Sequence, residues 1–267
     1  MRVLRTMVLL GALSTATACS GADNTEVVVP PDFAGIAVLG DSFSAGVGAG
    51  ELSGRCSRST LGWGEQLGEA LGLAVVNLAC AGAELSVIEE QAGGLPSGAT
   101  LAAVNLGGND IDLMGLVAAC LAGPCADART ERDPLYTDLA ERVEQTLGRI
   151  LERGRDLELL VVSGYPRLVG EGAECEDFPS EQGRVIDEAV RELNLILETT
   201  VVGLRGSGQP VAFSAVDEAE GHSLCSTEPW FHGAARGPLL LHPTLDGHRA
   251  MADSALRAVL EHRATAD

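Results

Sequence analysis

Three glycine-bearing segments of the chain hold residue types that acyl chemistry requires. They are GDSFS, which contains Ser42, NLACAG, which ends at Gly82, and GGND, which contains Asn109. Together they supply hydroxyl groups, backbone N–H groups that can point into a cavity, and an amide side chain. A hydroxyl can attack a carbonyl carbon, and the N–H and amide groups can hold the oxyanion that the attack creates. Ser42 is therefore a candidate nucleophile.

A serine hydroxyl is a poor nucleophile at neutral pH and needs a base, most often a histidine, within hydrogen-bond distance. His242 has the most defined place, because Pro243 forces it into an extended conformation and Thr244 can begin a helix. His242 is the predicted base. We expect His248, inside that helix, to have a surface or capping role. No neighbouring feature fixes the other three histidines, which are His222, His232 and His262.

Each glycine-bearing motif alone also has a structural explanation. A Gly-Asp-Ser sequence after a strand is more often a turn in which the aspartate caps a helix, and GGND can be a tight turn with Asn109 in a left-handed conformation. We expect Ser44 to be structural, Asp41 to bond nearby backbone, and Asp110 to cap the helix that begins there. GVGAG lacks the pattern and the lysine of a phosphate loop. There is no GxSxG elbow, and no cysteine or histidine cluster indicates a metal.

These segments need a scaffold, and five apolar runs predict one. The runs at residues 35–40, 73–79, 100–108, 157–166 and 209–216 read as strands, and their apolar character indicates burial on both faces. Helical spacing predicts helices over 61–72, 133–153, 180–205 and 244–263, the last two capped by Ser180 and Thr244. The alternation predicts an α/β fold with three α/β/α layers and a central five-stranded, mostly parallel sheet. Ligands bind such sheets at the carboxyl ends of the strands, where the three segments lie.

Four motifs in order resemble those of a known family. GDSFS, a lone glycine in the second segment, GGND, and HPTLDGH near the C-terminus are similar to the blocks of the SGNH hydrolases, also called GDSL-type esterases and lipases. The resemblance runs from about residue 34 to the C-terminal helix and implies the flavodoxin-like SGNH-hydrolase fold. It implies that Ser42 is the nucleophile and His242 the general base. Gly82 N–H and the Asn109 side chain would join Ser42 N–H as oxyanion donors, and no cofactor is implied.

One position departs from the family pattern. The family usually places an aspartate three residues before the histidine, to orient the imidazole and stabilise its charged form, and here that residue is Leu239. Some similar relatives use a main-chain carbonyl at this place, instead of an aspartate, to orient the histidine. We therefore expect the Leu239 carbonyl to accept from the imidazole N–H, which makes a Ser42–His242 dyad. A remote acid, for example Asp217 or Glu228, is the alternative.

The N-terminus has the layout of an export signal. Residues 1–18 carry two arginines, then a short apolar run, then Ala-Thr-Ala, which is typical of a secretory signal peptide. Residues 19–33 read as a linker, and residues 34–267 as the hydrolase domain. Cys19 stands where a lipoprotein signal would place an acylated cysteine, but cleavage after Ala18 fits equally well, so secretion and a lipid anchor both stay open. No stretch reaches the roughly 20 apolar residues of a transmembrane helix.

Export favours disulfides among the seven cysteines, and Cys19 is the odd one. The other six can pair in many ways. The positions of the cysteines along the chain favour three disulfides: Cys56 with Cys80, Cys120 with Cys125, and Cys175 with Cys225. Such a set resembles the secreted actinobacterial-type branch of the family, in which three bridges brace the active-site loops.

The chain is strongly acidic, with a formal net charge of −20, and all of its 18 basic residues are arginines. This charge argues against nucleic acid and anionic lipid as partners and favours a neutral or cationic substrate, although an acidic surface also keeps an exported protein soluble. The resemblance implies a monomeric, secreted serine esterase or lipase acting on carboxylic acyl esters. A phospholipase, a carbohydrate or acyl deacetylase, an acyltransferase and a non-catalytic binding protein remain alternatives, and Leu239 favours the last.

Overall fold

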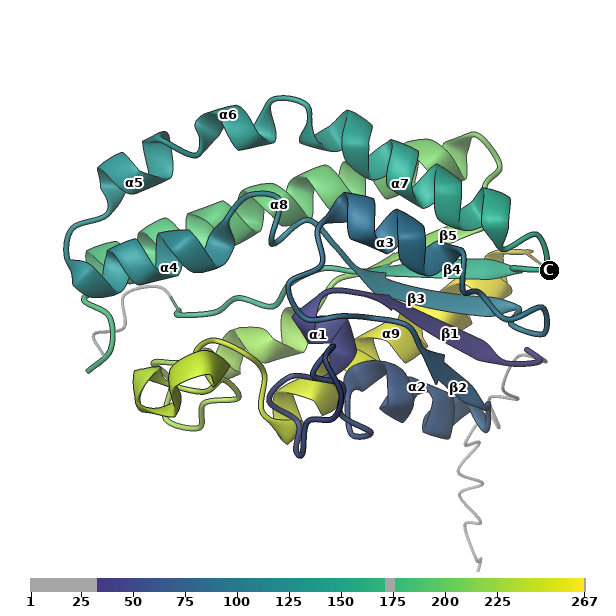
Figure 1. Ribbon diagram of the computed structural model, residues 1–267, viewed down its shortest axis with the longest axis horizontal. Coiled ribbons are helices and arrows are strands. Elements are labelled where there is room, and N and C mark those ends of the chain that lie inside the picture. Colours follow the sequence, from purple (N-terminus) through teal and green to yellow (C-terminus); the bar gives the residue numbers. More distant parts are fainter. Residues whose placement is uncertain (1–32, 171–175, 267) are drawn as a thin grey trace, which may run out of the picture.

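The structure is a computed structural model that describes residues 33–170 and 176–266. The predicted signal peptide, nearly all of the linker, Cys19 and Cys175 lie outside the described residues. One parallel sheet forms the centre of the molecule (Figure 1). Its strands are ordered β2-β1-β3-β4-β5, with bounds β1 Ile36–Gly40, β2 Val75–Asn77, β3 Leu101–Asn105, β4 Leu159–Ser163 and β5 Val211–Ser214.

Helices cover both faces of this sheet, so the predicted three-layer α/β/α arrangement is confirmed (Figure 1). On one face α2 (Trp63–Leu71) packs against α9 (Leu245–Ala266). On the other lie α3 (Leu85–Ala92), α4 (Leu113–Ala122), α7 (Leu139–Arg153) and α8 (Ser180–Gly206). The shorter helices are α1 (Ser42–Ala45), α5 (Ala126–Thr130), α6 (Asp133–Tyr136), and the 3-10 helices η1 (Asp217–His222) and η2 (Ala234–Leu239).

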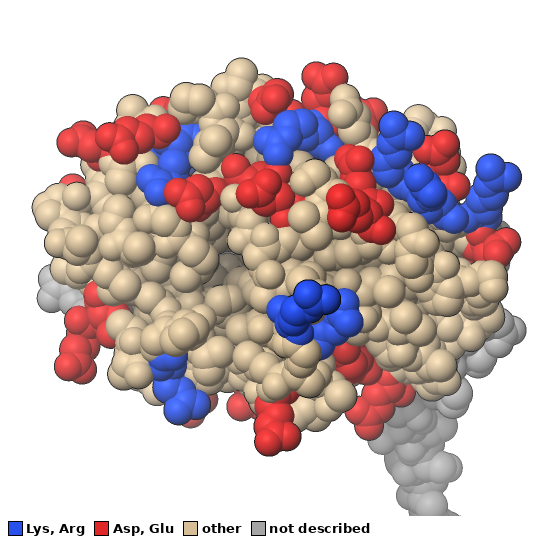
Figure 2. All heavy atoms as spheres, viewed as in Figure 1, with Lys and Arg blue, Asp and Glu red and all other residues tan. Residues whose placement is uncertain are grey.

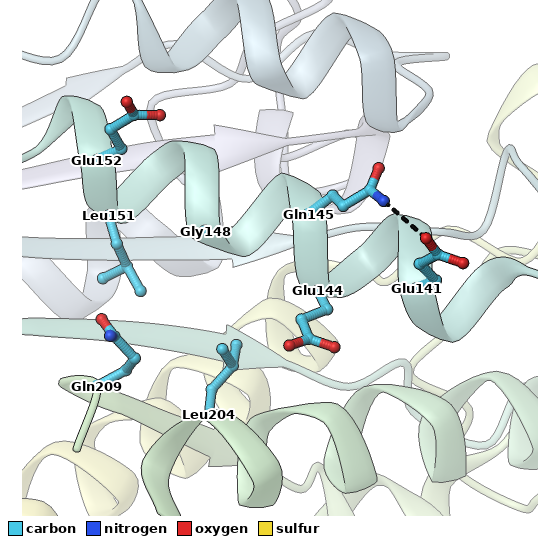
Figure 3. A pocket seen from close by; sticks show the side chains of 8 residues that line it. All are labelled: Glu141, Glu144, Gln145, Gly148, Leu151, Glu152, Leu204 and Gln209. Carbon is cyan, nitrogen blue, oxygen red and sulfur yellow. Dashed lines mark hydrogen bonds between the residues drawn. The ribbon is translucent and has the colours of Figure 1, made fainter. Parts of the chain in front are cut away.

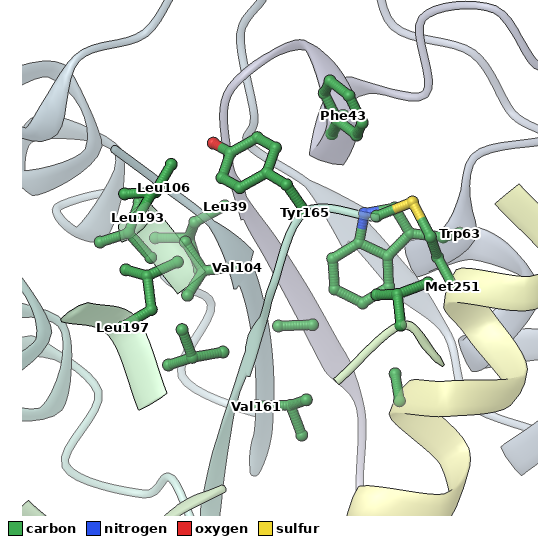
Figure 4. Packing of buried hydrophobic residues seen from close by; sticks show 14 of the residues in the cluster. Leu39, Phe43, Trp63, Val104, Leu106, Val161, Tyr165, Leu193, Leu197 and Met251 are labelled. Atoms are coloured by element: carbon green, nitrogen blue, oxygen red, sulfur yellow. The ribbon is translucent and has the colours of Figure 1, made fainter. Parts of the chain in front are cut away.

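The apolar runs become strands because both faces of the sheet are covered. Every residue of β1, β3 and β4 is buried, and burial of this apolar surface is the main favourable term in folding. Figure 4 shows Leu39, Val104 and Val161 of the sheet between Leu197 of α8 and Trp63 near α9. A core of this size can hold the loops at the ends of the strands in fixed positions.

The single helix expected over residues 133–153 is wrong, because the structure divides it into α6 and α7. At Asp138 the backbone leaves helical geometry, with a φ of −117°. The physical reason is burial: α7 buries Leu139, Val143 and Leu147 along one face, whereas no residue of α6 is buried. Because α6 has no buried side chain, packing does not favour one straight helix through α6 and α7. Ser180 is likewise the first helical residue of α8 and not its cap.

The strand order reverses its direction between β1 and β3. From β1 the chain moves to one side, to β2, and from β3 onward it moves to the other side. In parallel sheets the crevice at such a reversal is the usual ligand site. GDSFS follows β1 and GGND follows β3, so both segments meet there.

Within the described part of the chain, no helix is long and apolar enough to cross a membrane.

Candidate active site

The structure brings the predicted nucleophile and base together. Ser42 is the first residue of α1, directly beyond β1, and its Oγ lies 2.9 Å from Nε2 of His242, although 200 residues separate them in sequence. Ser42 is partly exposed, whereas the His242 side chain is largely buried. This contact is short enough for direct proton transfer between the hydroxyl and the imidazole.

A short antiparallel pairing fixes the backbone of His242. Phe231 bridges to Pro243, and the N–H of His232 donates to the carbonyl of His242 at 3.0 Å. Leu241, directly before the histidine, adopts a left-handed φ of 58°. A branched residue in that conformation is strained and persists only where its surroundings impose it. The constraint expected from Pro243 is therefore reinforced by a tertiary contact that no local pattern shows.

Burial lowers the pKa of His242, while the nearby carbonyls of Leu240 and Leu239 act in the opposite direction. A histidine that stays neutral at mildly acidic pH suits a general base. Among the described residues, no group is hydrogen-bonded to its Nδ1, and the Leu239 carbonyl accepts from the backbone N–H of His242 at 2.9 Å. Glu228 is exposed, and the side chain of Asp217 lies outside the description. The role of Leu239 stays a prediction.

The predicted oxyanion donors are available. In the part of the chain that is described, the backbone N–H groups of Ser42 and Gly82 donate to no other group. Gly82 has a φ of 81°, which favours glycine, and open space lies around its Cα. The Asn109 side-chain amide donates one hydrogen to the carbonyl of Ala83 at 2.9 Å and keeps a second hydrogen for a ligand.

Backbone contacts tie the donor-bearing segments together. The N–H of Cys80 donates to the carbonyl of Gly40 at 3.0 Å, which joins the second segment to the first. Gly40 itself has a φ of 121°, and a Cβ there would lie 2.2 Å from the Asn105 carbonyl, so only glycine fits this close approach. Ser44 is structural, as expected, because its buried Oγ accepts from the Asn105 N–H at 2.9 Å.

Two polar residues near the site have roles that differ from those expected. Asp110 does not cap the helix that follows it: one of its oxygens accepts from the N–H of Leu85, the first residue of α3, and the other pairs with Arg142. His248 is fully buried, so the expected surface or capping role is wrong. The backbone N–H of Trp63 donates to Nδ1 of His248 at 3.3 Å, and Nε2 of His248 donates to the Val47 carbonyl at 3.1 Å.

Asp41 confirms the expected backbone contact, since its Oδ1 accepts from the Phe43 N–H at 2.9 Å. Its other oxygen accepts from the Tyr165 hydroxyl. Burial raises the pKa of Asp41 to about 6, and the bonds from Tyr165 and Phe43 act against this rise. No local pattern in the sequence pointed to Tyr165, which lies 124 residues from Asp41.

Two predicted disulfides are present, Cys56–Cys80 and Cys120–Cys125. The first ends two residues before Gly82, so it anchors the loop that carries this predicted donor. Cys225 is also disulfide-bonded, but its predicted partner Cys175 lies outside the described residues, and that pairing stays a prediction.

The face drawn in Figure 2 is hollowed near its centre, and acidic side chains stand along the upper edge of this face.

A separate cavity of about 660 Å³ lies between α7 and the end of α8 (Figure 3). It is lined by Glu141, Glu144 and Glu152 together with glutamine, glycine and leucine residues, and it contains no serine, cysteine or histidine. It therefore lacks a nucleophile and a base for acyl chemistry. Within the described residues, no cluster of side chains is arranged to hold a metal ion.

Comparison with known proteins identifies the family of the chain. The model of the GDSL-like Lipase/Acylhydrolase family matches residues 38–250. "Lipase 1" of Streptomyces coelicolor is 30% identical over 231 residues, which cover 82% of this chain and 84% of that protein. A lipase of Streptomyces rimosus is 32% identical over 222 residues, which cover 78% of this chain and 80% of that protein.

Solved structures show the same fold. The extracellular lipase of Streptomyces rimosus superposes with a TM-score of 0.76 at 27% identity, covering 84% of this chain and 98% of that one. Phospholipase A1 of Streptomyces albidoflavus gives a TM-score of 0.75 at 24% identity over 84% of this chain and 98% of that one, a likeness of fold alone. The chain belongs to the GDSL-like lipase/acylhydrolase family and is a carboxylic ester hydrolase.

Proposed function

We propose that the chain is an exported serine esterase or lipase that hydrolyses acyl esters through a Ser42–His242 dyad. The 2.9 Å contact between Ser42 Oγ and His242 Nε2 is the observation that carries this proposal. The buried, neutral imidazole accepts the hydroxyl proton while Oγ forms a bond to the acyl carbon. The protonated imidazole then gives this proton to the departing alcohol. Water attacks the acyl-enzyme by the same steps, which releases the carboxylic acid and restores Ser42.

Three donors hold the oxyanion in this mechanism, namely the N–H groups of Ser42 and Gly82 and the Asn109 amide. The two unpartnered N–H groups and the spare amide hydrogen support this assignment. Each such donor contributes about 3 kcal/mol to the stability of the transition state, because it is aimed before the charge develops.

We further propose that a main-chain carbonyl, that of Leu239, orients His242. Its dipole favours the charged imidazole less than an aspartate would. The carbonyls of Leu239 and Leu240 both raise the pKa of this histidine, which supports a main-chain environment around it.

Export is proposed from the signal-like residues 1–18, with Cys19 as an acylation site or Ala18 as the end of the cleaved signal. The substrate we propose is an acyl ester without a strong negative charge, since a chain of net charge −20 repels anions. The protein acts as a monomer in this proposal and needs no cofactor, because the dyad and three donors supply both nucleophile and charge stabilisation.

The proposal is tested by hydrolysis of p-nitrophenyl esters of graded chain length. Ser42→Ala should abolish turnover, whereas Ser53→Ala, which removes an exposed hydroxyl from the following loop, should not change it. Turnover by Ser42→Ala at the wild-type rate would refute the assignment of the nucleophile.

A further inference from the structure

Tyr165 connects two segments of the site through a single oxygen atom. It follows β4, and its side chain is only 2% exposed. Its hydroxyl donates to Asp41, the residue before Ser42, and accepts from the N–H of Gly108, the residue before Asn109, at 3.1 Å. The nucleophile and one oxyanion donor are therefore each one residue away from the same hydroxyl.

The structure holds Tyr165 itself firmly. The side-chain amide of Asn194, on α8, accepts from the Tyr165 N–H at 2.8 Å and donates to its carbonyl at 2.7 Å. Its ring meets Phe43 edge to face, with the ring centroids 5.1 Å apart, and the Phe43 ring lies 5.6 Å from that of His242. Figure 4 shows Tyr165 between the sheet core and Phe43. Tyr165 therefore contacts residues next to Ser42 and Asn109, and it reaches His242 through the ring of Phe43.

We propose that Tyr165 is a positioning residue whose hydroxyl fixes the separation between the Ser42 segment and the Asn109 segment. This inference rests on the proposed function and explains how the oxyanion donors are held in position. Donors stabilise an oxyanion only when they already point at its place. A misplacement of about 1 Å can cost on the order of a hundredfold in rate.

Space filling alone does not account for this tyrosine. Phenylalanine would pack equally well against Phe43, and a buried hydroxyl costs free energy unless it is hydrogen-bonded. Among the described residues, the partners of this hydroxyl are Asp41 and Gly108, and Asp41 is itself buried. Removal of the hydroxyl would take one hydrogen bond from Asp41, which keeps its bond from Phe43, and one from the Gly108 N–H.

Tyr165→Phe tests the proposal, and Tyr136→Phe is the matched control. The chain has two tyrosines, and Tyr136 on α6 donates to the Ala189 carbonyl, away from the site (Figure 1). We expect Tyr165→Phe to lower kcat on the order of 10- to 100-fold with KM changed less than about threefold. Tyr136→Phe should match the wild type. Wild-type kcat in Tyr165→Phe, or a fall in thermal stability with kcat unchanged, would overturn the proposal.

A second measurement separates this proposal from the proposed function. The rate at which a fluorophosphonate labels Ser42 depends on the nucleophile and the oxyanion donors but not on the choice of ester. If wild-type protein is labelled yet hydrolyses none of the esters, the substrate assignment fails. Slower labelling of Tyr165→Phe than of Tyr136→Phe still supports the positioning role. Equal labelling rates would refute it even if the esters are hydrolysed.

A double-mutant cycle shows whether Tyr165 acts through Asp41. We expect the losses of kcat in Tyr165→Phe and Asp41→Asn not to add in the double variant, because both break the same hydrogen bond. Additive losses of kcat would refute the connection.

Discussion

Replacing His248 with glutamine is expected to remove an acid-sensitive element from the fold. The His248 ring is fully buried, accepts from the backbone N–H of Trp63 and donates to the Val47 carbonyl. Both bonds require the neutral imidazole with its proton on Nε2, because a second proton on Nδ1 would face the Trp63 N–H. Glutamine keeps an amide donor near Val47 but cannot be protonated at these pH values.

The size of the effect follows from the pKa values. Burial lowers the pKa of His248 from 6.5 to about 4. Between these values the unfolded chain binds a proton that the folded protein does not bind. The contribution of this residue to stability is therefore complete above pH 6.5 and is lost as the pH falls towards 4. The full loss amounts to about 3 kcal/mol.

Urea unfolding of the wild type and His248→Gln from pH 8 to pH 4.5, followed by circular dichroism, measures this effect. At pH 8 the difference in unfolding free energy gives the pH-independent cost of the substitution. Towards pH 4.5 we expect the wild type to lose most of the 3 kcal/mol estimated above relative to the variant. Asp41, whose pKa is raised to about 6, changes stability in the opposite direction, but it is present in both proteins and cancels. A free-energy difference that stays constant across the range would refute the reasoning.

Three further outcomes are expected. Asn109→Ala should lower kcat on the order of a hundredfold, because it removes one oxyanion donor, and an unchanged kcat in the ester assay would exclude Asn109 from the mechanism. The acid limb of the kcat/KM profile should have its midpoint below pH 6.5, because burial lowers the pKa of His242 and keeps it neutral; a midpoint above 6.5 would contradict this. Replacing Cys56 and Cys80 with alanine should lower the unfolding free energy by about 3 kcal/mol in denaturant titrations, since their bridge spans 24 residues; wild-type stability would show that this loop closure contributes little.

The strands were predictable because buried parallel strands are apolar along their whole length, and β1, β3 and β4 lie inside the expected runs. The break between α6 and α7 was not predictable, since apolar spacing continues from Leu135 through Leu151 while only α7 has buried residues. Periodicity records which residues are apolar, but tertiary packing decides which of them form one straight helix.

The proximity of Ser42 and His242 was predictable because both residues belong to short motifs, and the fold brings them together. The supporting residues were not. The hydroxyl partners of Tyr165 are 57 and 124 residues away, and the partners of His248 are 185 and 201 residues away. Neither residue belongs to a motif with fixed spacing. The expectation that a histidine within a helix lies at the surface failed because α2 and α9 pack together and enclose His248.

The central claim is that the His242 imidazole activates the Ser42 hydroxyl, and the rate of fluorophosphonate labelling tests it most directly. Peptide mass spectrometry should find the label on Ser42 in the wild type, and His242→Ala should slow labelling on the order of a thousandfold, the contribution of a general base. A label on another residue, or equal rates in the two proteins, would contradict the account.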